Sequence, residues 1–187
     1  DTTLLEFGTR RAFSPQASLW AARAAIAGGL DTTSNVLAAL QLGVQPSGTM
    51  AHSLVMALGA VAGGEQAAFS AFHRYFPGAP LLIDTYDPIA AATALAARIA
   101  AGELELSGIR LDSGDLITLS KQVKSILPDV DIFATGDLDE WEIAKLRAAN
   151  APINGFGVGT KLVTGTPVNG VYKLVEIDHI PTMKRST

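Results

Sequence analysis

Acidic, small and hydroxyl residues directly follow short apolar runs at three places in this chain, and these residue types are suited to chemistry. The run IRL at residues 109–111 leads into DSGD, the run VDIFA at 130–134 leads into TGD, and the run LLI at 81–83 leads into DTYD. In a parallel α/β sheet, the loops at the carboxyl ends of the strands hold the functional groups. These three loops therefore predict a binding site for a polyhydroxylated, phosphorylated substrate.

The DSGD loop is the densest of the three. Arg110 and Asp112 are two positions apart, so on a strand both side chains face the same side. An arginine can neutralise a phosphate, and an aspartate can accept hydrogen bonds from ribose hydroxyls or hold Mg²⁺. The alternative is an ion pair beside a helix start, with Asp112 or Ser113 as the N-cap. We favour the functional interpretation because the loop contains more acid than capping needs.

A histidine occupies the first turn of an apolar helix expected over residues 50–62. A helix N-terminus offers free N–H groups and the positive end of the helix dipole, so His52 would face a bound phosphate there. The alternative is an ordinary surface or satisfied histidine. We assign that interpretation to His73 and His179, which lie in an amphipathic helix and in the C-terminal tail.

Two further segments have residue types that bind anions or rings. The sequence EFGTRR at residues 6–11 follows a short strand; its arginines can bind a carboxylate or phosphate, and Phe7 can stack on an aromatic ring. A solvated basic turn beside a core Phe is the alternative. The glycine-rich stretch at 155–161 can form an anion-binding nest, although such stretches are common.

Apolar runs and helix-like segments alternate, which predicts repeated βα units. We expect strands at residues 4–7, 80–83, 107–111, 130–134, 153–157 and 171–177, and helices at 15–28, 36–42, 50–62, 65–76, 87–102, 115–127 and 138–149. The dinucleotide fingerprint and the P-loop are absent from the sequence. Acidic loops on successive strands favour a barrel, because a closed ring brings all carboxyl ends to one mouth. We expect one domain over 1–187.

Composition narrows the function classes. With 187 residues, a net charge of -4 and a pI near 5.3, the chain is not a basic nucleic-acid-binding domain. It has no Cys, which excludes disulfides and a thiol nucleophile. Residues 32–64 contain no charged residue, but prolines and glycines interrupt them, so we predict no membrane span and a cytoplasmic protein. The first residues have no signal-peptide layout, and the chain begins as if within a longer protein.

Taken together and in order, these segments resemble the nicotinate phosphoribosyltransferase family. The matching segments span nearly the whole chain, and they are EFGTRRAFSP at 6–15, DTTSN at 31–35, GTMAHS at 48–53, DTYD at 84–87, IRLDSGDL at 109–116, TGDLDE at 135–140 and FGVGTKL at 156–162. The resemblance implies the type II phosphoribosyltransferase fold, an irregular α/β barrel. It also implies that this chain is the barrel portion of the enzyme, without the family's N-terminal domain.

The family's reaction joins nicotinate to phosphoribosyl pyrophosphate (PRPP), giving nicotinate mononucleotide and pyrophosphate with coupled ATP hydrolysis. The resemblance therefore implies ATP as co-substrate, Mg²⁺ with the pyrophosphate through ligands that we do not assign, and a homodimer for the full-length enzyme. His52 matches the histidine that ATP phosphorylates. Arg110 and Asp112 would contact the phosphoribosyl part and the ring, Phe7 would stack on the pyridine ring, and Arg10 would lie near the ring or the substrate phosphate.

The remaining residues implied by the resemblance bind the sugar, the phosphate and the carboxylate of nicotinate. Ribose would be held by Gly136 and Asp137, and the 5′-phosphate by Gly157, Gly159 and Thr160. Nicotinamide-using relatives have an Asp within the stretch that matches residues 32–35. Here Ser34 offers a hydroxyl that can donate to a carboxylate, which points to nicotinate.

Two other functions remain open from the sequence. One is a binding module that holds a phosphorylated nucleotide without turnover. The other is a quinolinate phosphoribosyltransferase, which we rank lower, because the second carboxylate of quinolinate needs more basic residues than Arg10, Arg11, Arg110 and Lys161 supply.

Overall fold

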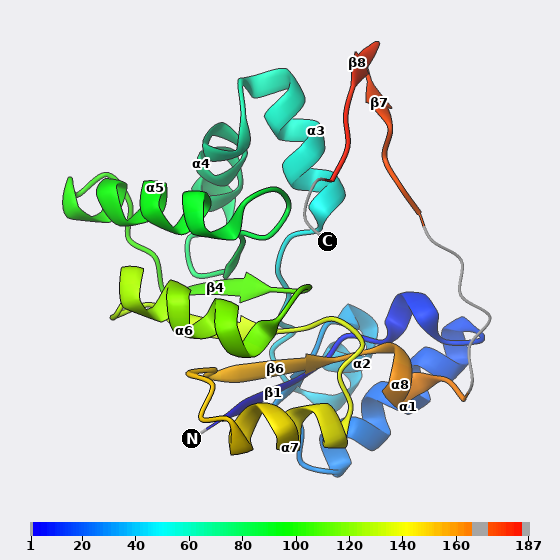
Figure 1. The fold of residues 1–187 in the computed structure, drawn as a ribbon. Helices are drawn as coiled ribbons and strands as arrows, with labels where there is room; N and C mark the ends of the chain where they lie inside the picture. The colour runs from blue at the N-terminus through cyan, green and yellow to red at the C-terminus, as the bar shows by residue number, and fades with distance from the viewer. Residues whose placement is uncertain (1, 166–171, 185–187) are drawn as a thin grey trace. The chain divides into compact units, whose positions relative to one another are not determined.

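The computed structural model describes residues 2–165 and 172–184, and its chain forms two compact units (Figure 1). The first unit contains Asp1–Gly48 and Phe133–Asn169, and the second contains Thr49–Ile132 and Gly170–Thr187. Each unit combines parallel strands with helices that follow them in the chain. This confirms the predicted α/β class; the closed barrel and the single domain over 1–187 stay predictions.

The strands of the first unit end together at one edge. β1 (Thr3–Glu6) pairs in parallel with β2 (Thr32–Thr33) on one side and with β6 (Gly155–Val158) on the other, and β6 pairs with the end of β5 (Asp131–Ala134). Glu6, the last residue of β1, lies opposite both Thr33 and Val158. The segments that follow β1, β2 and β6 therefore start at the same edge.

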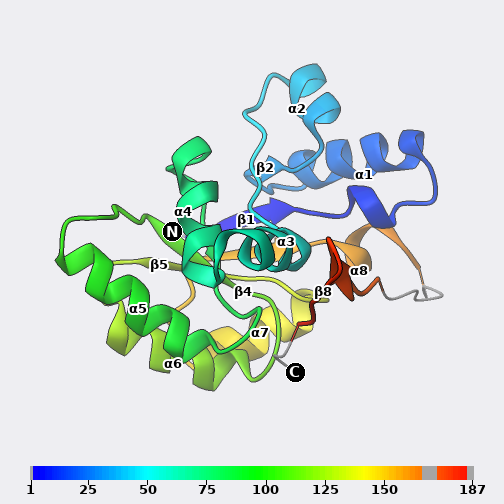
Figure 2. The ribbon, with the colours of Figure 1, turned by 90° about the horizontal axis from the view of Figure 1, so that it is seen from above.

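The helices of the first unit start at residues suited to capping. α1 (Pro15–Ala27) begins after Ser14, whose Oγ accepts from the Ala17 N–H at 3.0 Å, and Pro15 is its first residue. α2 (Val36–Leu42) begins after Asn35 and ends at Gly43, whose φ of 69° a glycine adopts without strain. Both helices contact β2 (Figure 2). The remaining helices are η1 (Thr9–Arg11), α7 (Glu140–Ala148) and α8 (Thr160–Val163).

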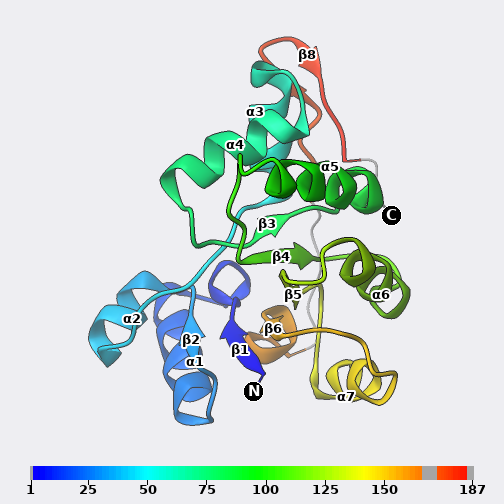
Figure 3. The same cartoon turned by 90° about the vertical axis from the view of Figure 1, so that its left-hand side faces the viewer.

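The second unit is built on β3 (Leu81–Leu82) and β4 (Gly108–Leu111), which pair in parallel with Leu82 opposite Arg110. α5 (Pro88–Ala100) packs against α6 (Leu116–Ile126) beside these strands (Figure 3), and α3 (His52–Ala62) packs against α4 (Glu65–Tyr75). A hairpin of β7 (Glu176–Ile177) and β8 (Ile180–Pro181) lies against α3. The apolar side chains of β3 and β4 are fully buried and form the core of this unit.

Most predicted elements are present, and the differences have local causes. The strand expected at 153–157 is present as β6, so most of the glycine-rich stretch at 155–161 is strand, and only residues 159–161 lie beyond it. The strand expected at 171–177 is confined to Glu176–Ile177, and Val171 lies outside the described residues. β2, η1, α8 and β8 were not predicted, because each has four residues or fewer and lies outside the apolar runs that indicated the other strands.

Within the described residues, no single helix is long and apolar enough to cross a membrane. Only the pair α3 and α4 together passes that test of length and composition, and the two helices are bent by 111° at their junction.

Candidate functional site

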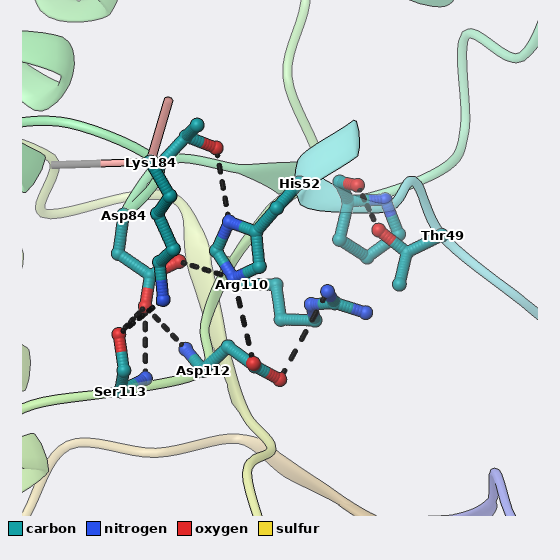
Figure 4. A network of polar contacts seen from close by, with 9 residues as sticks. Thr49, His52, Asp84, Arg110, Asp112, Ser113 and Lys184 are labelled. Atoms are coloured by element: carbon teal, nitrogen blue, oxygen red, sulfur yellow. Dashed lines mark hydrogen bonds and ion pairs between the residues drawn. The ribbon is translucent and has the colours of Figure 1, made fainter. Parts of the chain in front are cut away.

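His52 lies among three polar side chains of the second unit (Figure 4). Its Nδ1 is 3.1 Å from the Thr85 hydroxyl, and its Nε2 is 3.4 Å from Asp112 Oδ2 and 3.8 Å from Asp84 Oδ1. The side chain is only 20% exposed. Because Nε2 faces two carboxylate oxygens, we assign a proton to Nε2. Nδ1 then has a lone pair that accepts from Thr85.

Asp84 holds the DSGD loop in place from the end of β3. Its side chain is 1% exposed, and its Oδ2 accepts from the backbone N–H groups of Asp112 and Ser113, each at 2.8 Å, and from the Ser113 hydroxyl at 2.9 Å. Its other oxygen faces His52. One buried carboxylate therefore fixes the loop backbone and also faces the imidazole.

Arg110 and Asp112 lie side by side, as their spacing predicts. Arg110 Nη2 is 3.9 Å from Asp112 Oδ1, and the two side chains are 12% and 31% exposed. Asp112 thus faces Arg110 with one oxygen and His52 with the other. A carboxylate in this position can accept hydrogen bonds from sugar hydroxyls while the guanidinium faces an anion.

The capping role that we considered for Asp112 and Ser113 belongs to another residue. α6 begins after Asp115, whose Oδ1 accepts from the N–H groups of Ile117 at 3.1 Å and Thr118 at 3.3 Å. The first two polar residues of the loop are therefore not needed for the helix start. This supports the functional interpretation of Asp112.

Lys184, from the tail after β8, also reaches the loop. Its Nζ donates to the Ser113 Oγ at 3.1 Å, and Ser113 Oγ in turn donates to Asp84 (Figure 4). This contact was not predicted, because no spacing in the sequence distinguishes a lysine in a tail. The loop thus makes hydrogen bonds both to Asp84 and to Lys184 of the C-terminal tail.

In the first unit, Phe7 packs against β6 just after β1 ends. A Cβ on Gly157 would come within 2.8 Å of Phe7 Cδ2 and 2.7 Å of Thr135 Cγ2, so only glycine leaves room for the ring. A Cβ on Gly159 would come within 3.0 Å of the Phe7 carbonyl oxygen. The glycines that we expected to cradle a phosphate therefore also accommodate Phe7.

A backbone hydrogen bond to Glu6 holds Ser34 close to Phe7. The Ser34 N–H donates to the Glu6 carbonyl oxygen at 2.9 Å, and Phe7 follows Glu6 directly. Ser34 is partly exposed, whereas Arg10, in η1, is exposed. The structure thus brings Ser34 near the start of the EFGTRR segment, with Arg10 facing solvent.

The TGD loop turns sharply after β5, and Thr135 is buried at its start. Gly136 has φ of 96° and Asp137 has φ of 50°, and both are exposed. Asp tolerates this left-handed conformation better than most residues. Lys161 donates to Asp139 Oδ2 at 2.6 Å; this hydrogen bond raises the pKa of Lys161 and lowers the pKa of Asp139, with Asp137 adding to the effect on Lys161.

Comparison with known proteins identifies the family. The model of the nicotinate phosphoribosyltransferase (NAPRTase) family matches residues 2–184. The chain belongs to this family.

Similar proteins agree with that assignment. Nicotinate phosphoribosyltransferases of Bacillus subtilis and Mycobacterium tuberculosis are 41% and 43% identical to this chain, over 95% and 94% of its length. A crystal structure of nicotinate phosphoribosyltransferase from Vibrio cholerae matches all of it with a TM-score of 0.84 and 25% identity. The chain spans 38% and 39% of the two curated relatives and 50% of the crystallised chain. The fold class predicted from the resemblance is thus confirmed.

The structure groups the predicted site residues of this family member by unit. His52, Arg110 and Asp112 come together in the second unit, and Phe7, Ser34, Gly157 and Gly159 follow or flank the strand ends of the first. The sequence analysis gave no role to Asp84 or Thr85, although DTYD was among the matching segments. Their signal was an acid and a hydroxyl directly after a buried strand.

Glu65, in the second unit, has an altered pKa. Burial, together with the negative charges of Asp84 and Asp87, raises the pKa of Glu65 from 4.5 to about 7. Glu65 begins α4, and its Oε1 is buried without a hydrogen bond in the described part of the chain. Within residues 2–165 and 172–184, no group of three His, Asp or Glu side chains is arranged to hold a metal ion.

Proposed function

We propose that this protein joins nicotinate to PRPP, releasing nicotinate mononucleotide and pyrophosphate. The ring nitrogen attacks C1 of the ribose as the bond from C1 to the pyrophosphate oxygen breaks, and the pyrophosphate leaves with the bonding electrons. The observation that supports this best is the cluster of Arg110 and Asp112, at the end of β4, with His52 at the start of α3, in a chain of this family. Positioning and charge stabilisation are the main requirements of such a transfer.

The second-unit cluster is suited to the phosphoribosyl group. We assign Asp112 to the ribose hydroxyls and Arg110 to an anionic oxygen of PRPP. Their 3.9 Å separation holds the two side chains beside one another, and Asp84 fixes the loop between them and α6. Preorganised groups of this kind need little rearrangement when charge develops on the leaving group.

The first-unit residues are suited to the ring and the phosphate. We assign Phe7 to stacking on the pyridine ring, Ser34 to the carboxylate and Arg10 to the ring or phosphate. The residues assigned to ribose and the 5′-phosphate are Gly136, Asp137, Gly157, Gly159 and Thr160. The packing of Phe7 against Gly157 supports a fixed ring orientation.

His52 is our candidate for coupling to ATP. A nucleophilic imidazole needs one nitrogen with a lone pair and a partner that orients the ring. Asp112 and Asp84 face Nε2, which supports Nδ1 as the nitrogen that attacks: it gives up its hydrogen bond from Thr85 and receives the phosphoryl group as ADP leaves. Labelled ATP should transfer acid-labile phosphate to the wild-type protein and to His73→Asn, but not to His52→Asn; equal labelling of His52→Asn would contradict this role.

Mg²⁺ would enter with the substrate rather than occupy a resident site. Asp84 Oδ2 already accepts three hydrogen bonds, which leaves Asp112 as the accessible carboxylate of the cluster. Mg²⁺ is commonly held by one or two carboxylates together with substrate phosphates, and this donor set fits that pattern. The ion would neutralise charge on the pyrophosphate.

The setting of the full-length protein is also part of the proposal. We propose a homodimer in the cytoplasm, acting in NAD salvage. The net charge of -4 supports small anionic substrates in complex with a cation over a nucleic-acid partner.

Pyrophosphate release tests the proposed reaction. The full-length protein, given PRPP and Mg²⁺, should release pyrophosphate with nicotinate and at least about tenfold more slowly with nicotinamide, because the Ser34 hydroxyl bonds more strongly to a charged carboxylate than to a neutral amide. Faster release with quinolinate would favour the other phosphoribosyltransferase. Binding of nicotinate mononucleotide without any turnover would favour the binding module.

A further inference from the structure

Glu6 is a fully buried carboxylate outside the roles assigned above. Its side chain is 1% exposed, at the last position of β1. Burying a carboxylate is costly unless hydrogen bonds compensate, so its partners indicate its purpose. One oxygen, Oε1, accepts from the Gly8 N–H, and the other, Oε2, accepts from the Thr33 hydroxyl. Both donors are neutral, and they belong to two different segments.

The two segments that Glu6 joins contain the residues assigned to the pyridine ring. Gly8 directly follows Phe7, and Thr33 directly precedes Ser34. The Glu6 carbonyl oxygen also accepts from the Ser34 N–H at 2.9 Å. Glu6 therefore holds the Phe7–Gly8 turn with its side chain and the segment of Ser34 with both its side chain and its backbone.

Hydrogen bonds connect Thr33, through Asn35, to the helices α2 and α1. Thr33 Oγ1 accepts from the Asn35 N–H at 2.9 Å, and Asn35 caps α2 and donates from Nδ2 to Ser18 Oγ of α1 at 3.1 Å. Thr33 is fully buried and Asn35 is 7% exposed. The position of the segment that contains Ser34 is thus fixed on one side by helices and on the other by Glu6.

Local packing leaves the Phe7–Gly8 turn little room to move. A Cβ on Gly8 would overlap the Val163 side chain and come within 2.9 Å of Glu6 Oε1, so the position requires glycine. The Phe7 N–H donates to the Val158 carbonyl at 2.8 Å. The carboxylate of Glu6 is therefore the side-chain link between a tightly packed turn and the neighbouring segment.

We propose that Glu6 is a positioning residue that fixes Phe7 relative to Ser34 and thereby sets the affinity for the pyridine carboxylate. This inference rests on the proposed function, because it takes Phe7 and Ser34 as the ring and carboxylate contacts. Glu6 itself is buried and touches no substrate. Its effect is expected on the binding of nicotinate, with less effect on PRPP.

Steady-state kinetics of the full-length protein tests the inference. Glu6→Ala should raise the KM for nicotinate by about 10- to 100-fold, because two buried donors lose their acceptor, while the KM for PRPP changes by less than about threefold. Thr33→Val, which removes the hydroxyl that donates to Glu6 and accepts from the Asn35 N–H, should raise the same KM by about three- to tenfold. Valine has nearly the same shape as threonine, so Thr33→Val still tests the inference if Glu6→Ala does not fold.

The conservative variant and a matched control separate positioning from stability. In Glu6→Gln the amide oxygen can accept from Gly8 and the amide nitrogen can donate to Thr33, so the KM for nicotinate should stay within about threefold of wild type. Asp31 accepts from the Leu4 N–H at 2.7 Å at the other end of the same strand pair. Asp31→Ala should lower the melting temperature and leave the KM for nicotinate unchanged.

Amide hydrogen exchange gives a readout that does not need activity. The Ser34 amide is bonded to the backbone of Glu6, which substitution retains, so faster exchange there in Glu6→Ala but not in Glu6→Gln reports a loosened segment. Equal rises in both KM values, a Glu6→Gln variant as defective as Glu6→Ala, or unchanged Ser34 exchange would each overturn the inference. Absence of wild-type turnover with nicotinate would instead overturn the proposed function.

Discussion

At the residue scale, the second-unit site depends on Asp84 more than on any side chain that was predicted from the sequence. Its Oδ2 accepts three hydrogen bonds from the DSGD loop, and its Oδ1 faces His52. Because all three donors bond to Oδ2, the two carboxylate oxygens of Asp84 have different functions. One holds the loop, and the other presents charge to the imidazole.

This division predicts different outcomes for two substitutions of Asp84. In Asp84→Asn the amide oxygen can take the place of Oδ2, so the free energy of unfolding should change by less than about 1 kcal/mol; in Asp84→Ala it should fall by about 2–4 kcal/mol, because buried donors are left unpaired. Urea denaturation measures both. Glu105→Gln, at an exposed position, is the control. An Asp84→Ala variant as stable as wild type would contradict the bonding described.

Part of this residue-scale account could be predicted from the sequence. The two-residue spacing of Arg110 and Asp112 placed them on one side, and they lie 3.9 Å apart. Asp84 stood after a strand in the same way, but its bonds run to residues 28 and 29 positions away, and no local pattern encodes such contacts. The contact between Lys184 and Ser113, across 71 positions, is further beyond prediction from the sequence alone.

At the element scale, caps and parallel strand ends place the candidate residues. Asn35 is the N-cap of α2, with its Oδ1 accepting from the Ala38 N–H at 2.9 Å, and its Nδ2 binds Ser18 of α1. It is buried, so both groups would be unsatisfied without these bonds. The helix start and the segment that contains Ser34 are therefore stabilised by the same side chain.

Asn35→Ala should lower the free energy of unfolding by about 2–3 kcal/mol, since it removes a cap and a buried hydrogen bond together. Ser14→Ala is the matched comparison: Ser14 caps α1 at an exposed position, and its loss should cost about 1 kcal/mol. Chemical denaturation of both variants gives the difference. Equal losses would show that the bond to Ser18 contributes nothing.

Helices with clear caps were predicted within a few residues, because Ser14-Pro15, Asn35, Asp87-Pro88 and Asp115 mark their starts. The elements β2, η1, α8 and β8 were not predicted, because their two to four residues show no period, whereas the equally short β4 and β5 lie in longer apolar runs. The strand over 153–157 was also predicted and is present as β6, although glycine normally weakens a strand. Here Gly155 and Gly157 make room for Phe133 and Phe7, a tertiary requirement that composition does not reveal.

At the scale of the whole molecule, protonation of Glu65 should make stability depend on pH. Its folded pKa of about 7 exceeds the ordinary 4.5, so the folded state binds more protons than the unfolded state between these values. The stability that Glu65 contributes is present below pH 4.5 and is lost as pH rises through 7.

Glu65→Gln removes this titration. Between pH 5 and pH 7.5, the wild-type protein should lose about 1 kcal/mol more unfolding free energy than Glu65→Gln, a figure reduced for the partial exposure of the side chain. Urea denaturation at a series of pH values measures the difference. Parallel pH profiles for the two proteins would show that Glu65 titrates normally.

We propose that the second-unit cluster acts in phosphoribosyl transfer, and the chain spans 38% of the length of the Bacillus subtilis relative. The full-length protein is therefore the one to assay. Family and fold class followed from ordered motifs in the sequence, whereas the bonds that hold the cluster required the structure.

The most direct test compares pyrophosphate release from nicotinate and PRPP by the wild-type protein, Asp112→Ala and His73→Ala. Loss of the carboxylate between Arg110 and His52 should slow release by about 100-fold or more, and His73→Ala should stay within about twofold of wild type. An Asp112→Ala variant that releases pyrophosphate at the wild-type rate, or a His73→Ala variant that is equally slow, would contradict the proposed site.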